Sequence, residues 1–131
     1  MKKKILALLS FCIMTTICFG QVQWYRATSF ASKTANSSYW SAWEESNVQM
    51  MFNLTTDQII IYSPITQRYN VIRQVEAPYD ASGTQVRFLV TNSNGYYGYV
   101  RLRIENNGNS QVYVDFTDGS IVYNVRRIYI D

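Results

Sequence analysis

The sequence contains no histidine, and its two cysteines, Cys12 and Cys18, both lie within the first 20 residues. From residue 21 onward the chain has no thiol or imidazole to serve as a nucleophile, a general base or a soft metal ligand, and it can form no internal disulfide. This inventory excludes zinc sites, Cys/His catalysis and Ser-His-Asp hydrolysis. We therefore expect no bound metal and no cofactor.

Carboxylates are the remaining catalytic groups, and their positions argue against a catalytic pair. Glu44 and Glu45 are sequence neighbours and cannot both point to one face of a strand. Asp118 is explained by the Asp118-Gly119 turn, in which aspartate is a favoured residue. Glycosidase chemistry needs two carboxyl groups about 5 to 10 Å apart across a cleft, and nothing in the pattern requires that arrangement. We expect that the protein is not an enzyme.

The segment from Met1 to Gly20 has the pattern of a secretory signal peptide. Lys2 to Lys4 form a basic start, Ile5 to Phe19 an apolar run, and Cys18-Phe19-Gly20 a cleavage site before Gln21. The apolar run is shorter than the roughly 20 residues that span a bilayer, so we expect no stable membrane insertion after cleavage. The prediction is a signal peptide over 1–20, a single β-barrel domain over 21–131, and a secreted or periplasmic location in a Gram-negative bacterium.

Basic charge is scarce once the signal peptide is set aside. The whole chain has 12 basic and 9 acidic residues. Without the three lysines of the basic start, nine basic residues balance nine acidic ones. A neutral domain lacks the electrostatic attraction that phosphate backbones require, so we expect no nucleic-acid partner.

From residue 21 onward, apolar residues recur with a period of two, and no window carries a sustained helical stripe. The pattern predicts an all-β fold with little helix and eight strands, at about 22–30, 47–54, 57–62, 68–75, 84–91, 98–105, 111–117 and 120–130. One apolar face runs through every strand. An open sheet would leave that face wet and two edges unpaired, so we expect an antiparallel up-and-down meander closed into a small barrel or flattened clam.

The turns fix an expected pairing of each strand with the next. We place the turns at Thr55-Thr56, Ser63 to Gln67, Asn94 to Tyr96, Asn107 to Asn109 and Asp118-Gly119. The expected opposite residues are Phe52 with Ile59, Ile61 with Tyr69, Phe88 with Leu102, Leu102 with Val114, and Val114 with Tyr123. The same alternation places Arg101 opposite Asp115 on the outer face.

In strand number and order the chain resembles the calycin group of small barrels, the lipocalins and fatty-acid-binding proteins, over about 100 residues. The resemblance implies a secreted, lipocalin-like protein without catalysis that binds a small amphiphilic or anionic hydrophobic ligand. Alternation places Arg73, Arg127 and Tyr129 on the apolar face, and Arg127-Ile128-Tyr129 resembles the Arg-x-Tyr element that holds the ligand carboxylate in fatty-acid-binding proteins. These three residues are a candidate anion anchor, unless the arginines lie at strand ends and reach water.

Direction alternates along a meander, so the sequence also predicts which connections share an end of the barrel. The 31–46 segment shares its end with the turns at 63–67, 94–96 and 118–119. This end is expected to gather Tyr39, Trp40, Trp43, Tyr96 and Tyr97. The cluster is either a hydrophobic plug or a platform for a ligand or partner, because Tyr and Trp dominate binding hot spots.

The chain also contains a short Ser-Gly sequence at the opposite end. Ala81-Ser82-Gly83-Thr84 resembles the Ser-Gly loop that secreted β-barrel inhibitors of lysozyme present to the enzyme's acidic cleft. The resemblance implies an alternative function as a protein-interaction module or hydrolase inhibitor with a filled barrel. Ser82 and Gly83, or the aromatic end, would then contact the partner. The expected partner is thus a small molecule or another secreted protein.

Overall fold

The computed structural model describes residues 22–77 and 81–129. The predicted signal peptide and its cleavage point before Gln21 lie outside the described residues. Within the described ranges no helix is long and apolar enough to cross a membrane.

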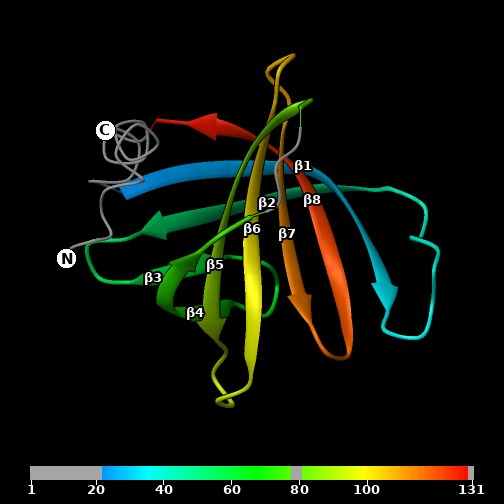
Figure 1. Ribbon diagram of the computed structural model, residues 1–131. Coiled ribbons are helices and arrows are strands. Elements are labelled where there is room, and N and C mark those ends of the chain that lie inside the picture. Colours follow the sequence, from blue (N-terminus) through cyan, green and yellow to red (C-terminus); the bar gives the residue numbers. More distant parts are fainter. Residues whose placement is uncertain (1–21, 78–80, 130–131) are drawn as a thin grey trace.

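The described chain forms eight antiparallel strands in one sheet, without a helix (Figure 1). They are β1 (Val22–Thr34), β2 (Glu44–Asn53), β3 (Gln58–Ile61), β4 (Gln67–Val75), β5 (Gly83–Thr91), β6 (Tyr97–Glu105), β7 (Ser110–Phe116) and β8 (Gly119–Ile128). Each strand pairs with the next, and β8 pairs with β1, so the ring is closed. The predicted all-β meander and its closure are confirmed.

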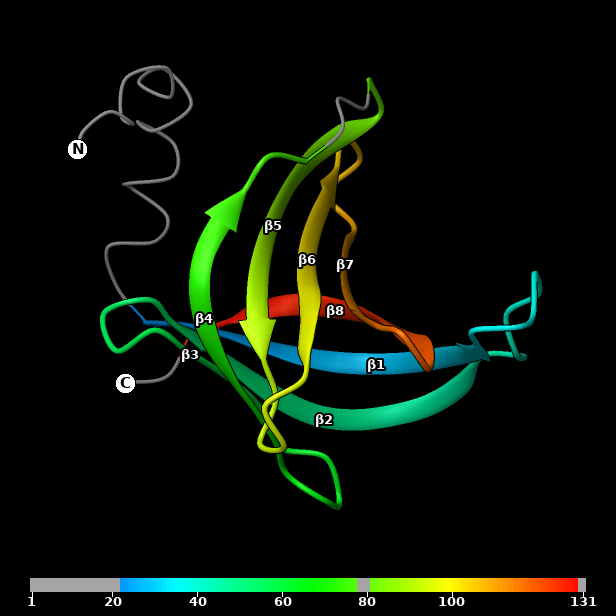
Figure 2. The same ribbon diagram turned by 60° about the horizontal axis from the view of Figure 1, so that its bottom comes forward.

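The ring is not an even barrel. Figure 2 shows β4 to β7 running steeply across the direction of β1 and β2, which gives two curved layers. The strands also differ in length, from 13 residues in β1 to four in β3. Register shifts interrupt β1 between Ala27 and Ser29 and β4 between Val71 and Arg73. Such bulges bend a strand and exchange its inner and outer faces, which is how one strand serves both layers.

Side chains from the inner faces of all eight strands fill the centre of the ring. The largest fully buried ones are Phe52, Phe88, Met50, Ile59, Ile61 and Leu102. The ring centroids of Phe52 and Phe88 are 6.3 Å apart, and Tyr25 meets Phe52 edge-on at 5.5 Å. Side chains packed in this way fill the centre of the ring, and the two pockets described below lie toward one of its ends.

The strand pairing agrees with the prediction in one hairpin and differs by two residues in four. Phe52 lies opposite Ile59 as expected. The other four observed pairs are Ile61 with Gln67, Phe88 with Val100, Leu102 with Val112, and Val114 with Ile121. A shift of two residues keeps every side chain on its predicted face, so the apolar interior is preserved although the pairing was wrong.

The position of glycine in the turns explains two of these shifts. Asn92 and Tyr96 close a three-residue loop through an N–H to carbonyl hydrogen bond of 2.9 Å, and Gly95 is its last residue, with φ 86°. Glu105 and Asn109 close a similar loop that ends at Gly108, with φ 94°. A three-residue hairpin loop needs its left-handed residue in the last position, whereas the sequence prediction had placed glycine in the middle.

Candidate functional site

We call the mouth the end of the ring that carries the β1–β2, β3–β4, β5–β6 and β7–β8 connections. Two pockets open there. The apolar pocket, between β1, β2, β3 and β8, has a volume of about 640 Å³. The polar pocket, between the β1–β2 loop and the β7–β8 turn, has a volume of about 690 Å³. Ile121 lines both, so the two pockets adjoin at this side chain.

The walls of the apolar pocket include Phe30, Val48, Pro64 and Ile121. Phe30 reaches the inner face because the bulge in β1 shifts the alternation, so that Phe30 pairs with the inward-facing Tyr123 of β8. The two rings lie 6.2 Å apart. The bulge therefore supplies an aromatic wall that strict alternation along β1 would have placed outside.

A hydrogen-bonded chain of polar side chains lies beside these walls. The hydroxyl of Tyr69 donates to Oε1 of Gln67 at 2.6 Å. The Nε2 group of Gln67 donates to the hydroxyl of Tyr123 at 3.1 Å and to Oγ of Ser63 at 3.0 Å. Gln67 thus links β4 to β8, strands that are not neighbours in the ring.

Burial keeps both phenols protonated. The pKa of Tyr69 is raised to about 12, first by burial and then by the nearby charges of Tyr123 and Asp118. Burial also raises the pKa of Tyr123, against the hydrogen bond from Gln67, which lowers it. At neutral pH both groups are hydroxyl donors in a site of low polarity.

The polar pocket collects side chains of a different kind. The aromatic residues in its wall are Tyr39, Trp40, Tyr69 and Phe116, and its polar residues include Lys33, Asn92 and Asp118. The ammonium of Lys33 lies 4.8 Å from the centre of the Trp40 ring. This wall therefore combines ring faces with hydrogen-bonding groups of both charges.

The predicted aromatic cluster divides into two groups. Figures 1 and 2 both show the β1–β2 loop projecting far from the β5–β6 turn, which carries Tyr96 and is followed by Tyr97 at the start of β6. Trp40 packs edge-on against Tyr113, on the outer face of β7, with ring centres 6.2 Å apart. Tyr39 and Trp40 line the polar pocket, and Trp43 is half-exposed beside β2. The loop leans on the outside of the barrel and is not a plug.

The candidate anion anchor is not assembled. Arg73 follows the bulge in β4 and pairs with the outward-facing Leu89, so its predicted inward position was wrong. Arg127 keeps its inward alternation opposite Tyr25, but it is exposed at the end of the barrel away from the mouth. Its guanidinium lies 5.9 Å from the Tyr25 ring and 4.9 Å from the Tyr129 ring. The bulge separates the two arginines onto opposite faces.

Ser82 and Gly83 have structural roles. The Ser82 carbonyl accepts a hydrogen bond of 2.8 Å from the backbone N–H of Asn106, and its hydroxyl accepts one from Arg103. A Cβ on Gly83 would lie 2.5 Å from the carbonyl oxygen of Ile104, which explains the glycine. The Ser-Gly sequence is held against the β6–β7 turn by the hydrogen bond from Asn106.

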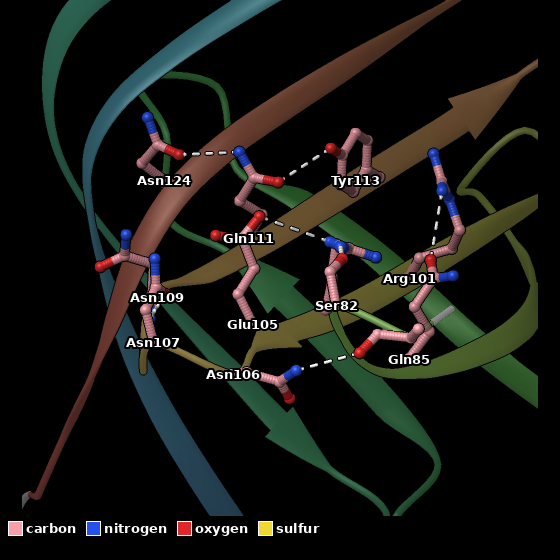
Figure 3. Close-up of polar contacts among 12 residues, drawn as sticks. Ser82, Gln85, Arg101, Glu105, Asn106, Asn107, Asn109, Gln111, Tyr113 and Asn124 are labelled. Atoms are coloured by element: carbon pink, nitrogen blue, oxygen red, sulfur yellow. Dashed lines mark hydrogen bonds and ion pairs between the residues drawn. The ribbon is translucent and has the colours of Figure 1, made fainter. Parts of the chain in front are cut away.

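The outer face of β6 to β8 carries a second polar network, drawn in Figure 3. Gln111 donates to Asn124 at 3.0 Å and accepts from the Tyr113 hydroxyl at 2.9 Å. Arg101 lies opposite Tyr113 but reaches diagonally to Asp115 at 2.9 Å, so the expected partners meet despite the altered pairing. These contacts tie neighbouring strands together and border a pocket of about 300 Å³. The two pockets at the mouth are each about twice that volume, so the mouth is the candidate site.

The sequence prediction missed Gln67, Asn92 and Asp118 as site residues. One available signal was the Gln-x-Tyr pattern, which occurs at 23–25, 67–69 and 111–113. In each case the tyrosine hydroxyl donates to the glutamine two residues earlier, on the same face of the strand.

In the described part of the chain, no three Cys, His, Asp or Glu side chains are grouped so that they could hold a metal ion. Comparison of the sequence with protein-family models finds no match, and comparison with curated proteins finds none either.

Proposed function

We propose that this protein is a secreted, non-catalytic binding protein for a small neutral amphiphile, held in the apolar pocket at the mouth. The observation that carries the proposal is the Tyr123 hydroxyl, a buried donor in the wall of a pocket of about 640 Å³ with apolar sides. Pockets of this size and composition, with few polar groups in fixed positions, are typical of small-molecule sites.

The hydrogen-bond inventory supports a ligand oxygen opposite Tyr123. A phenol has one proton to donate, and the Tyr123 hydroxyl accepts from Gln67. Among the described residues no acceptor takes the Tyr123 proton, since Oε1 of Gln67 accepts from Tyr69. A ligand carbonyl, ether or hydroxyl oxygen would satisfy this donor, while its apolar body covers Phe30 and Val48.

The charges at the mouth favour a neutral ligand over the anionic one considered from sequence. Glu45 lines the apolar pocket and Asp118 the adjoining polar pocket, whereas both candidate anchor arginines lie elsewhere. An anionic head would be repelled by both carboxylates and attracted by Lys33, the single cation among the residues that line these two pockets, so the balance of charge is against it. A neutral hydrogen-bond acceptor meets no such repulsion.

The test is a fluorescence titration with prodan, a neutral naphthyl ketone whose emission depends on its surroundings. We expect saturable 1:1 binding to the mature protein and an affinity about three- to tenfold lower in Tyr123→Phe, because one hydrogen bond is lost without a change in volume. Tyr113→Phe removes a phenol from the outer face and should leave the affinity unchanged. The anionic dye anilinonaphthalene sulfonate should bind more weakly than prodan.

Two outcomes would contradict the proposal. The first is the absence of saturable prodan binding to the wild-type protein. The second is equal affinity in wild type and Tyr123→Phe, which would mean that the pocket is not used or that its donor has no role.

The alternative of a protein-interaction module is favoured by the exposed aromatics alone. Tyr96 and Tyr97, 67% and 64% exposed, line neither pocket at the mouth. If prodan does not bind, these tyrosines become the surface to substitute in a search for a secreted protein partner.

A further inference from the structure

We infer that the polar pocket holds the head group of the same amphiphile, and that this head is a neutral polyhydroxyl group such as a sugar. This inference rests on the proposed function, because it assigns the second half of the ligand. The two pockets share Ile121, so one molecule can place an apolar tail against Phe30 and Val48 and its head beyond Ile121.

The polar pocket offers hydrogen-bonding capacity of both kinds. Oδ1 of Asn92 already accepts from the backbone N–H groups of Asn94 and Tyr96, so its Nδ2 group is the part left to bind a ligand. Within the described ranges, the Asp118 carboxylate accepts from no side chain and the Lys33 ammonium forms no ion pair. The wall thus presents an acceptor, an amide donor and a cationic donor.

A polyhydroxyl head matches this mixture better than a charged head does. Each hydroxyl both donates and accepts, so neighbouring hydroxyls can satisfy Asp118 and Asn92 together. An anionic head would be attracted by Lys33 but repelled by Asp118, and a cationic head would be attracted by Asp118 but repelled by Lys33. A neutral head meets neither repulsion and gains hydrogen bonds to charged groups, which are the stronger kind.

The aromatic residues of the pocket supply the other half of sugar recognition. The C–H bonds of a sugar ring form a weakly positive face, which is attracted to the negative face of an aromatic ring. Tyr39 is 82% exposed in the pocket wall, so its ring has a free face. Trp40 is held in place by its edge contact with Tyr113.

Calorimetry with three probes tests the inference: octyl β-glucoside below its micelle concentration, 1-octanol, and methyl β-glucoside. In the wild-type protein we expect octyl β-glucoside to bind about tenfold tighter than 1-octanol, as two additional hydrogen bonds and a ring contact would give. Methyl β-glucoside alone should bind too weakly to detect, because it lacks the tail.

Substitutions in the polar pocket should remove the advantage of the head and leave the tail unaffected. Asp118→Asn and Tyr39→Ala should each reduce the tenfold preference to about threefold or less, with unchanged octanol affinity. The matched controls are Asp57→Asn, which removes a carboxylate at the opposite end, and Tyr96→Ala, which removes an exposed tyrosine from the β5–β6 turn. Both controls should keep the tenfold preference.

The outcomes separate this inference from the proposed function. Binding of 1-octanol with no gain from the glucose head, or an equal loss in the control variants, would overturn the inference and leave the apolar site standing. No binding of either octyl probe would overturn both.

Discussion

The same pair of residues, a tyrosine bonded to the glutamine two positions earlier, lies inside the barrel at both ends with opposite consequences. At the mouth, the amide nitrogen of Gln67 donates hydrogen bonds to Ser63 and Tyr123, and these side chains border the apolar pocket. At the opposite end, Gln23 is 2% exposed, and its Nε2 group has no partner among the described residues. The local motif sets only the first hydrogen bond, and the surrounding strands decide whether the second amide group is used.

The packed centre lies between the two ends. The largest loss of stability is expected from a substitution in this core. Leu102→Ala should lower the free energy of unfolding by about 2–5 kcal/mol, because it removes a fully buried side chain from a filled core. Tyr97→Ala, on the exposed face of the same strand, should cost about 0.5 kcal/mol or less. Urea unfolding of both variants measures the difference. Equal losses would mean that the alternation assigned to β6 is wrong.

A substitution at Gly98 would crowd the side chains at the mouth. A Cβ at this position would lie 2.6 Å from the ring of Phe116. Gly98→Ala should cost about 1–3 kcal/mol of stability, because that ring is itself packed 5.7 Å from Tyr69 and must move. Combining it with Phe116→Leu should recover part of the loss in thermal unfolding. A double variant no more stable than Gly98→Ala would show that the clash lies elsewhere.

The sequence predicts correctly which side chains face the interior where the alternation along a strand is uninterrupted. Phe88, Leu102 and Val114 are inside because their strands are regular. Arg73 was placed on the wrong face because it follows a bulge, and a bulge has no strong signal in the local pattern. A bulge forms where a strand must bend to serve both layers, and that requirement comes from the closed ring.

The site was less predictable than the fold for a related reason. The partners of Gln67 depend on β4 and β8 facing each other across the ring, 56 residues apart in sequence at Tyr123. Pairing shifts of two residues did not alter the interior, but they changed which polar groups meet at the turns. Side chains such as Asn92 and Asp118 therefore gained their site positions from turn geometry that the sequence prediction had placed differently.

Because the pKa of Tyr69 is raised, the free energy of unfolding should depend on pH in the alkaline range. Its folded value is about 12 against an ordinary value of 10, so between these limits the unfolded chain loses the proton first. Stability from this group is complete below pH 10 and falls by about 1–2 kcal/mol as the pH rises toward 12. Unfolding at pH 8 and pH 11 should show a steeper loss in wild type than in Tyr69→Phe. Parallel losses would indicate that Tyr69 titrates normally.

An effect of similar size is expected at the opposite end, where it tests the contrast between the two glutamines. Tyr25→Phe removes the 2.8 Å hydrogen bond to Oε1 of Gln23 and leaves the whole buried amide without a described partner, at a cost of about 1–2 kcal/mol. Adding Gln23→Met removes the amide as well, so the double variant should return to within about 0.5–1 kcal/mol of wild type, because the buried amide that lost its partner is gone. The corresponding pair at the mouth, Tyr69→Phe with Gln67→Met, should not recover, since Gln67 also serves Ser63 and Tyr123. Chemical unfolding of the two single and two double variants measures these differences. If stability recovers in both double variants, or in neither, the hydrogen bonds of the amide nitrogen do not distinguish Gln67 from Gln23.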